Sequence, residues 1–270
     1  MAVGPKPDAA LAVGAHPDDI EFMMSGTLML LGEAGLRLHY MNIASGSCGT
    51  ATEAHREIVR RRRTEALDAC KLIGATHHES IVDDIEVFHT TEIVRKVAAA
   101  VRTVRPRIML VPSPQDYMED HVNASRVAVT AAFTRGMLNY PSDPEVEPVA
   151  DEVTIYHALP YGLRGPLRER IRPGQYVDVS SVMTAKRRML ACHRSQKEWL
   201  DKSQGVNAYL ETMAGFAAEV GEMSGRFEFA EGWRRRSHLG FSAADDDPLS
   251  EILGERCFVD DEYEAALEGP

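Results

Sequence analysis

The first half of the chain alternates short apolar runs with longer segments in which apolar residues recur every three or four positions. The runs at 10–15 and 108–111 are typical of buried strands, whereas the spacing after residue 18 is typical of a helix that Gly35 ends. Beyond residue 140 the pattern is weaker. The chain is predicted to form strands at residues 10–15, 36–44, 79–82, 107–111, 152–158 and 175–180, and helices at 18–34, 52–73, 90–104, 121–138, about 181–200 and about 204–223.

The alternation of strands and helices indicates a Rossmann-like α/β fold with a doubly wound, mostly parallel sheet. In the usual strand order 3-2-1-4-5, the first and fourth strands are neighbours at the switch point, where open α/β sheets bind ligands. We predict that residues 1–200 form this core. Residues 201–270 are expected to form a helical C-terminal extension and tail, which pack on the core and are not an independent domain.

A histidine and two aspartates occupy the turn after the first predicted strand, in the run His16-Pro17-Asp18-Asp19. His16 and Asp19 are three residues apart at the start of a helix, so their side chains can converge on one point. An imidazole with a carboxylate suits a divalent metal, zinc above all. Adjacent helix residues point about 100° apart, which leaves Asp18 facing a different target. The alternative is that either aspartate only caps the helix and His16 is a polar turn residue.

His121 has the same position relative to the fourth predicted strand, because it begins the helix that follows that strand. A catalytic zinc site needs a third protein ligand and an open position for water. His121 is therefore our candidate for the third ligand. The adjacent Asp120 is a candidate for the carboxylate that orients a ligand; the alternative is a solvated aspartate at the start of the helix.

These motifs resemble those of a known family. The run from Ala15 to Asp19, together with Asp120-His121, resembles the LmbE/PIG-L zinc-dependent N-deacetylases, which act largely on N-acetylglucosaminyl compounds. Supporting patterns are Arg62 with Glu65, Asp84 after the third predicted strand, and the late run His193-Arg194-Ser195-Gln196. The resemblance covers roughly residues 9–200.

The resemblance implies a role for each matching residue. Zinc would be held by His16, Asp19 and His121, although another divalent metal is an alternative, and Asp18 would be the general base. Contacts to sugar hydroxyls are implied for Arg62 and Asp84, and relatives are often homo-oligomers, trimers or hexamers. The alternative for Arg62 is that it contacts no substrate, because it lies in a run of four arginines that can form a solvated helix face.

One position departs from the family pattern. Many members have a histidine three residues before the last zinc ligand, where it helps to stabilise the oxyanion, and this chain has Met118 there. Methionine cannot donate a hydrogen bond. Three explanations are open. Another residue supplies the hydrogen-bond donor to the oxyanion, the substrate differs from that of the family, or the chain is a weak enzyme or not an enzyme. His238 is a candidate replacement in the substrate site, either its own or a neighbouring subunit's; the alternative is an exposed loop histidine.

Composition excludes several classes of protein. The 270 residues are 44% hydrophobic, enough for a substantial core, and the net charge of −11 argues against binding nucleic acid or an anionic membrane. The four cysteines lack CxxC spacing, and no signal peptide or membrane span is recognisable, so we expect reduced thiols and a cytoplasmic location. No G-x-G-x-x-G follows the first strand, which argues against a dinucleotide-dependent oxidoreductase.

Two functions from different classes remain. The first is a zinc-dependent hydrolase that removes an acetyl or similar acyl group from an amine, on an amino sugar of N-acetylglucosamine type, with water activated by Asp18. The second is a metal- or ligand-binding homologue with little or no deacetylase activity, an alternative that Met118 raises.

Overall fold

A single sheet runs through the molecule. The computed structural model describes residues 8–197, 208–267 and 269, and in this part of the chain the sheet has eight strands in the order β3-β2-β1-β4-β5-β7-β6-β8. The strands are β1 (Ala9–Gly14), β2 (Arg37–Asn42), β3 (Thr76–His78), β4 (Ile108–Val111), β5 (Thr154–Ala158), β6 (Gln175–Asp178), β7 (Ala230–Arg235) and β8 (Cys257–Val259). The first five are parallel and the last three join as antiparallel pairs, which confirms the predicted doubly wound order 3-2-1-4-5.

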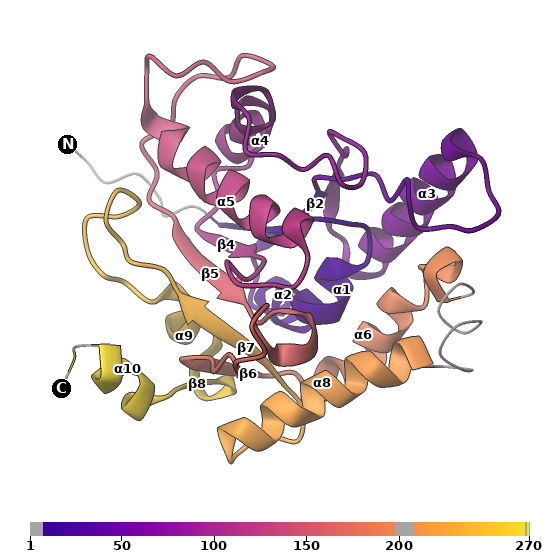
Figure 1. Cartoon of the computed structure of the whole chain (residues 1–270). Helices are drawn as coiled ribbons and strands as arrows, with labels where there is room; N and C mark the ends of the chain where they lie inside the picture. Colours follow the sequence, from indigo (N-terminus) through magenta and orange to yellow (C-terminus); the bar gives the residue numbers. More distant parts are fainter. Residues whose placement is uncertain (1–7, 198–207, 268, 270) are drawn as a thin grey trace.

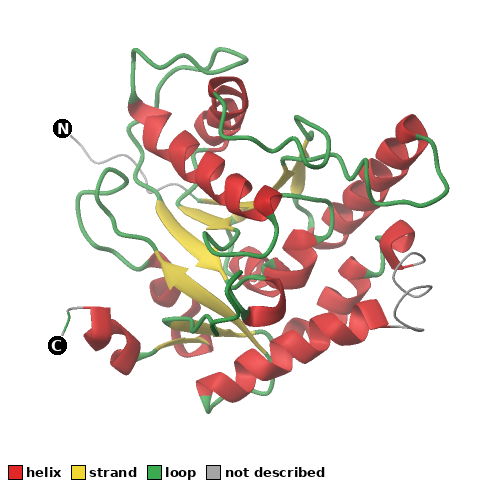
Figure 2. Ribbon diagram, viewed as in Figure 1, coloured by secondary structure: helices red, strands yellow, loops and turns green. Residues whose placement is uncertain are grey.

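Helices cover both faces of the sheet (Figures 1 and 2). Alternate residues of each central strand enter opposite cores: Ala10 and Leu110 join one, and Leu11 and Met109 join the other. The first core is completed by α1, α2, α3, α6, α8 and α9, and the second by α4 and α5. The helices are α1 (Asp19–Met23), α2 (Ser25–Glu33), α3 (His55–Ile73), α4 (Thr91–Val104), α5 (Glu119–Phe133), α6 (Met183–Leu190), α8 (Ala208–Ser224), α9 (Pro248–Leu253) and α10 (Asp261–Leu267).

The helix predicted at 18–34 is divided into α1 and α2. Distant residues stabilise the break: the ammonium group of Lys186 donates to two carbonyls in the last turn of α1, at 2.9 Å each. The carboxylate of Glu231 accepts the first N–H groups of α2, from Gly26 at 2.8 Å and Thr27 at 2.7 Å. Helix ends leave backbone N–H and C=O groups without hydrogen-bond partners. The buried ion pair between Lys186 and Glu231 supplies these partners, which in a continuous helix would come from the helix backbone.

Two further predictions are wrong in detail. The strand expected at 79–82 lies at β3, because Gly74 ends α3 in a left-handed conformation and the chain pairs with β2 from Thr76 onward; Val82 makes only an isolated bridge. The region predicted as a helical extension from residue 201 also contains β7 and β8, and β7 lies between β5 and β6.

Other boundaries shift by a few residues. The helix expected at 121–138 is α5, which starts and ends earlier. The predicted helix ends between residues 198 and 207 lie outside the described residues. Among the described helices, none combines the length and apolar character that a bilayer crossing requires.

Candidate metal centre

The turn after β1 carries the first two predicted ligands. β1 ends at Gly14 and α1 begins at Asp19, so Asp18 is the residue before the helix and not part of its first turn. Asp18 has a φ of 115°, a conformation that costs a non-glycine residue about 1–3 kcal/mol. The carboxylate of Asp19 accepts the backbone N–H groups of Ala15 and His16 at 2.9 and 2.8 Å. Backbone hydrogen bonds therefore fix the orientation of this carboxylate.

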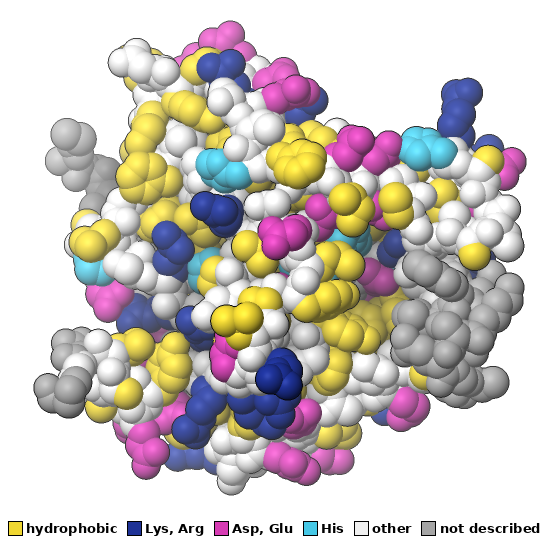
Figure 3. Space-filling view, viewed as in Figure 1, with side chains coloured by type: hydrophobic (Ala, Val, Ile, Leu, Met, Phe, Trp, Pro, Cys, Tyr) yellow, Lys and Arg dark blue, Asp and Glu magenta, His cyan; other side chains and the backbone are white. Residues whose placement is uncertain are grey.

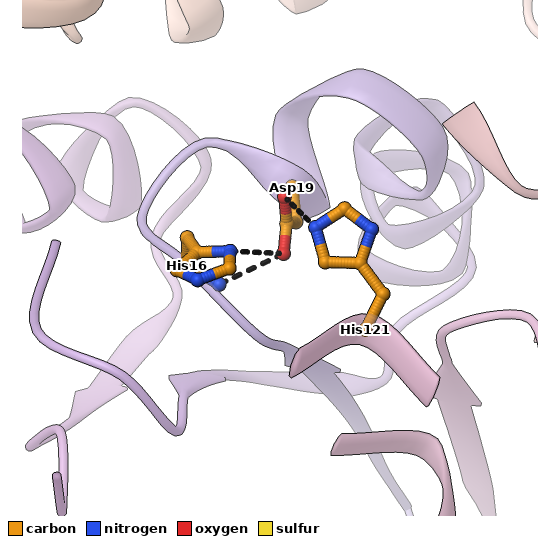
Figure 4. Close-up of side chains that lie close together, drawn as sticks. All are labelled: His16, Asp19 and His121. Carbon is orange, nitrogen blue, oxygen red and sulfur yellow. Dashed lines mark hydrogen bonds and ion pairs between the residues drawn. The ribbon is translucent and has the colours of Figure 1, made fainter. Parts of the chain in front are cut away.

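The turn after β4 brings His121 to the same place, because β1 and β4 are paired neighbours. The carboxylate of Asp19 lies between the two imidazoles: its Oδ2 is 3.7 Å from Nδ1 of His16, and its Oδ1 is 3.4 Å from Nε2 of His121 (Figure 4). One ligand atom from each of the three residues lies within 4.8 Å of the others. The structure thus brings together the three residues predicted as metal ligands.

Each imidazole is held on its far side by a further carboxylate. Nε2 of His16 is 2.9 Å from Oδ2 of Asp120, and Nδ1 of His121 is 3.0 Å from Oδ1 of Asp116. Asp120 therefore contacts His16 and not its neighbour in the chain. Nothing in the sequence singles out Asp116 apart from its place in the loop before His121. Carboxylates in these positions orient metal-binding imidazoles and make them better ligands.

These contacts change the ionisation of the cluster. Burial opposes a charge on His16, but its hydrogen bonds to Asp120 and Asp19 outweigh burial and raise its pKa to about 9. Burial likewise opposes a charge on His121, yet the carboxylates of Asp19 and Asp116 raise its pKa well above the ordinary value. Burial would raise the pKa of Asp19, but the two imidazoles hold it well below its ordinary value. The cluster therefore favours positive charge at its centre.

The donor set fits a divalent cation. Two imidazole nitrogens and a carboxylate oxygen are the ligands of many three-ligand zinc sites, and the remaining position there is open to water or substrate. His16 and His121 each keep one ring nitrogen directed at the shared carboxylate while the other is engaged by Asp120 or Asp116. A cation bound here would take the place of the protons that the imidazoles hold.

The cluster lies on a cavity of about 390 Å³ at the carboxyl ends of the parallel strands. Four aromatic residues line it together with the polar groups: Phe22, Tyr117, Tyr161 and Tyr209. In the space-filling view, hydrophobic side chains gather beside histidine and acidic side chains between α1 and α8 (Figure 3). Such a mixture of apolar walls and a few converging polar groups is typical of a small-molecule site.

Arg62 and Asp18 meet in this cavity. The guanidinium Nη2 of Arg62 lies 3.4 Å from Oδ2 of Asp18 and donates to the carbonyl of Pro17. Arg62 is only 3% exposed, so the alternative of a solvated helix face is wrong. Burial raises the pKa of Asp18, and the charge of Arg62 acts against that rise.

Asp84 lines the same cavity from the segment after β3. Its carboxylate accepts the backbone N–H of Gly46 at 2.7 Å and that of Cys48 at 2.9 Å. Asp84 therefore joins the loop after β2 to the cavity wall. Its contact with a sugar stays a prediction.

Met118 and His238 lie in different places. Met118 lines the cavity directly before α5. His238 follows β7, lies 3.4 Å from Oδ1 of Asp245, and is not among the described residues that line the cavity of its own chain. A role for His238 in a neighbouring subunit's site stays a prediction.

Sequence comparison finds similarity to deacetylases. The family model "PIG-L: GlcNAc-PI de-N-acetylase" matches residues 11–132. Diacetylchitobiose deacetylase of Thermococcus kodakarensis is 29% identical over 231 residues, which cover 83% of this chain and 81% of that protein. The match and this relative bear out the resemblance to the LmbE/PIG-L deacetylases.

Solved structures share the fold of this chain. N,N'-diacetylchitobiose deacetylase from Pyrococcus horikoshii superposes with a TM-score of 0.72 at 22% identity, covering 90% of this chain and 88% of that one. GalB, the 4-carboxy-2-hydroxymuconate hydratase from Pseudomonas putida, superposes with a TM-score of 0.73 at 21% identity, covering 89% and 99%. Because the same fold occurs in a hydratase, the fold alone does not select the reaction.

The match to the PIG-L family model ends at residue 132, and some residues that line the cavity lie after it. It includes His16, Asp19 and His121 together with Asp18, Arg62 and Asp84. Tyr161 and Tyr209 come from the segment after residue 132. The part of the chain after residue 132 therefore completes the cavity.

Proposed function

We propose that this protein is a metal-dependent N-deacetylase that removes an acetyl or similar acyl group from an amino sugar of N-acetylglucosamine type. The observation that carries the proposal is a separate carboxylate beside the ligand cluster: Asp18 faces the same cavity, yet its contacts go to Arg62 and Tyr209. The names of the family model and of the Thermococcus relative support an N-acetylated sugar as the substrate.

The residues of this chain divide the reaction between them. A divalent cation such as zinc, held by His16, Asp19 and His121, would polarise the amide carbonyl and lower the pKa of water. Asp18 accepts a proton as water adds to the carbonyl carbon. It then gives that proton to the amine as the C–N bond breaks, so the products are a free amine and a carboxylate. The guanidinium of Arg62, 3.4 Å from Oδ2 of Asp18, stabilises the charged form of this carboxylate.

Met118 bears on the rate. A methionine offers no hydrogen bond to the oxyanion, and loss of one such donor typically costs about 10²–10³ in rate. A cation held by His16, Asp19 and His121 would offset the negative charge that develops on the carbonyl oxygen, and any further hydrogen-bond donor would come from the substrate or from another cavity residue. Zinc as the native metal, homo-oligomeric assembly and a cytoplasmic location also stay predictions.

We expect the purified protein to release acetate and free amine from N-acetylglucosamine compounds, including diacetylchitobiose. A chelator should abolish release and added zinc should restore it, since Asp18 alone cannot activate water at neutral pH. Acetate and primary amine are measured in parallel, because hydrolysis must yield one of each. If the folded, zinc-loaded protein hydrolysed no compound in a panel of amides, the result would favour the alternative function, a metal- or ligand-binding protein with little or no deacetylase activity.

A further inference from the structure

Tyr209 joins α8 to the turn that carries Asp18. Its hydroxyl donates to Oδ2 of Asp18 at 2.6 Å, although the two residues are 191 positions apart in the chain. The tyrosine is 2% exposed, and its ring packs edge-to-face against Phe22 with the centroids 5.1 Å apart. Both the ring and the hydroxyl are therefore held firmly at the cavity wall.

The contacts of Asp18 are one-sided. Oδ2 accepts the Tyr209 hydroxyl and lies 3.4 Å from the Arg62 guanidinium. Within the described ranges, no hydrogen bond or ion pair engages Oδ1. One oxygen of this carboxylate is thus anchored while the other is available to a group in the cavity.

We propose that Tyr209 is a positioning residue for the deacetylation: its hydroxyl fixes one oxygen of Asp18 so that the other faces the reacting water. The inference rests on the proposed function and adds a residue from outside the segment that matches the family model. A hydrogen bond from a hydroxyl to a carboxylate is short and strong, and it restricts rotation of the carboxylate. Proton transfer requires the accepting oxygen within hydrogen-bond reach of the water, so this restriction acts on the rate.

A buried tyrosine hydroxyl usually has a partner, so the contact needs a test that separates positioning from packing. The chain supplies a matched control in Tyr156, whose hydroxyl donates to Oδ1 of Asp247 at the same distance of 2.6 Å. Tyr156 is fully buried and lies outside the cavity. Each variant removes a hydroxyl that donates to a carboxylate, and only Tyr209→Phe touches Asp18. Tyr156→Phe also removes the acceptor of the Leu249 N–H at 3.1 Å, so it is the more severe test of packing.

The experiment measures kcat, KM, melting temperature and zinc affinity for both variants. In Tyr209→Phe we expect kcat to fall about 10–100-fold with KM and zinc affinity nearly unchanged, since a misplaced proton acceptor affects the reacting state and not binding. In Tyr156→Phe we expect wild-type kcat. Equal kcat in the two variants would overturn the inference, as would a loss in Tyr209→Phe that appears in KM alone.

Crystal structures of the two variants give a readout that needs no turnover. We expect the Asp18 carboxylate to rotate in Tyr209→Phe and to keep its wild-type orientation in Tyr156→Phe. An unchanged Asp18 in Tyr209→Phe would overturn the positioning role, even if the protein is an active deacetylase. A rotated Asp18 would support it even if no amide is hydrolysed, so failure of the proposed function and failure of this inference are distinguishable.

Discussion

Replacing Asp18 by asparagine is expected to lower kcat for acetate release about 10²–10⁴-fold, the usual contribution of a positioned general base. Asparagine has nearly the same shape but cannot accept a proton from water or pass one to the amine. Zinc should still bind, because Asp18 is not one of the three clustered residues. Steady-state kinetics and zinc competition with a chelating dye measure the two effects separately.

The control for this experiment is Asp83→Asn. Asp83 lies one residue before Asp84 but does not line the cavity; its carboxylate accepts from Ser45 and lies 2.7 Å from His55. We expect this variant to keep the wild-type kcat. If Asp18→Asn retained kcat within about tenfold of the wild type, equivalent to only about 1.4 kcal/mol of barrier, Asp18 would not be the general base.

Lys186→Met is expected to reduce the free energy of unfolding by about 3–5 kcal/mol, the usual cost of breaking a buried ion pair by removing one partner. Lys186 is completely buried against Glu231, and it also donates to the carbonyls of Glu21 and Phe22 at the end of α1. Methionine fills the space but leaves the carboxylate and both carbonyls without this partner. Urea denaturation followed by circular dichroism measures the loss.

Two controls separate this pair from ordinary ion pairs. Lys96, on the surface of α4, contacts Glu92 at 2.8 Å, and Lys96→Met should cost no more than about 1 kcal/mol. The double variant Lys186→Met with Glu231→Gln should recover part of the stability, because the buried charge is gone. A loss below about 1 kcal/mol for Lys186→Met alone would mean that the ion pair does not hold the break between α1 and α2.

The sequence was sufficient for the order of the first five strands and for the convergence of His16, Asp19 and His121. Continuous apolar runs identify strands buried on both faces, and parallel strands joined by helices bring their carboxyl ends to one edge. The distance between the two histidine turns along the chain is therefore no obstacle, because β1 and β4 are neighbours in the sheet.

Long-range contacts explain what the sequence did not predict. The break between α1 and α2 depends on Lys186 and Glu231, which local spacing in the segment 18–34 cannot reveal. Glu231 belongs to β7, a strand inside the sheet whose buried glutamate and two terminal arginines, Arg234 and Arg235, are not typical of a buried strand. Tyr209 belongs to the buried core, and nothing near it in the sequence indicates that its hydroxyl reaches Asp18.

The most direct test is anomalous diffraction from crystals soaked with zinc. We expect a peak bound by His16, Asp19 and His121, with the Asp18 carboxylate outside the ligand set, and no such peak in crystals of His121→Ala. Zinc bound without His121, or bound directly by Asp18, would show that these three residues are not the metal site and that Asp18 is not the free carboxylate.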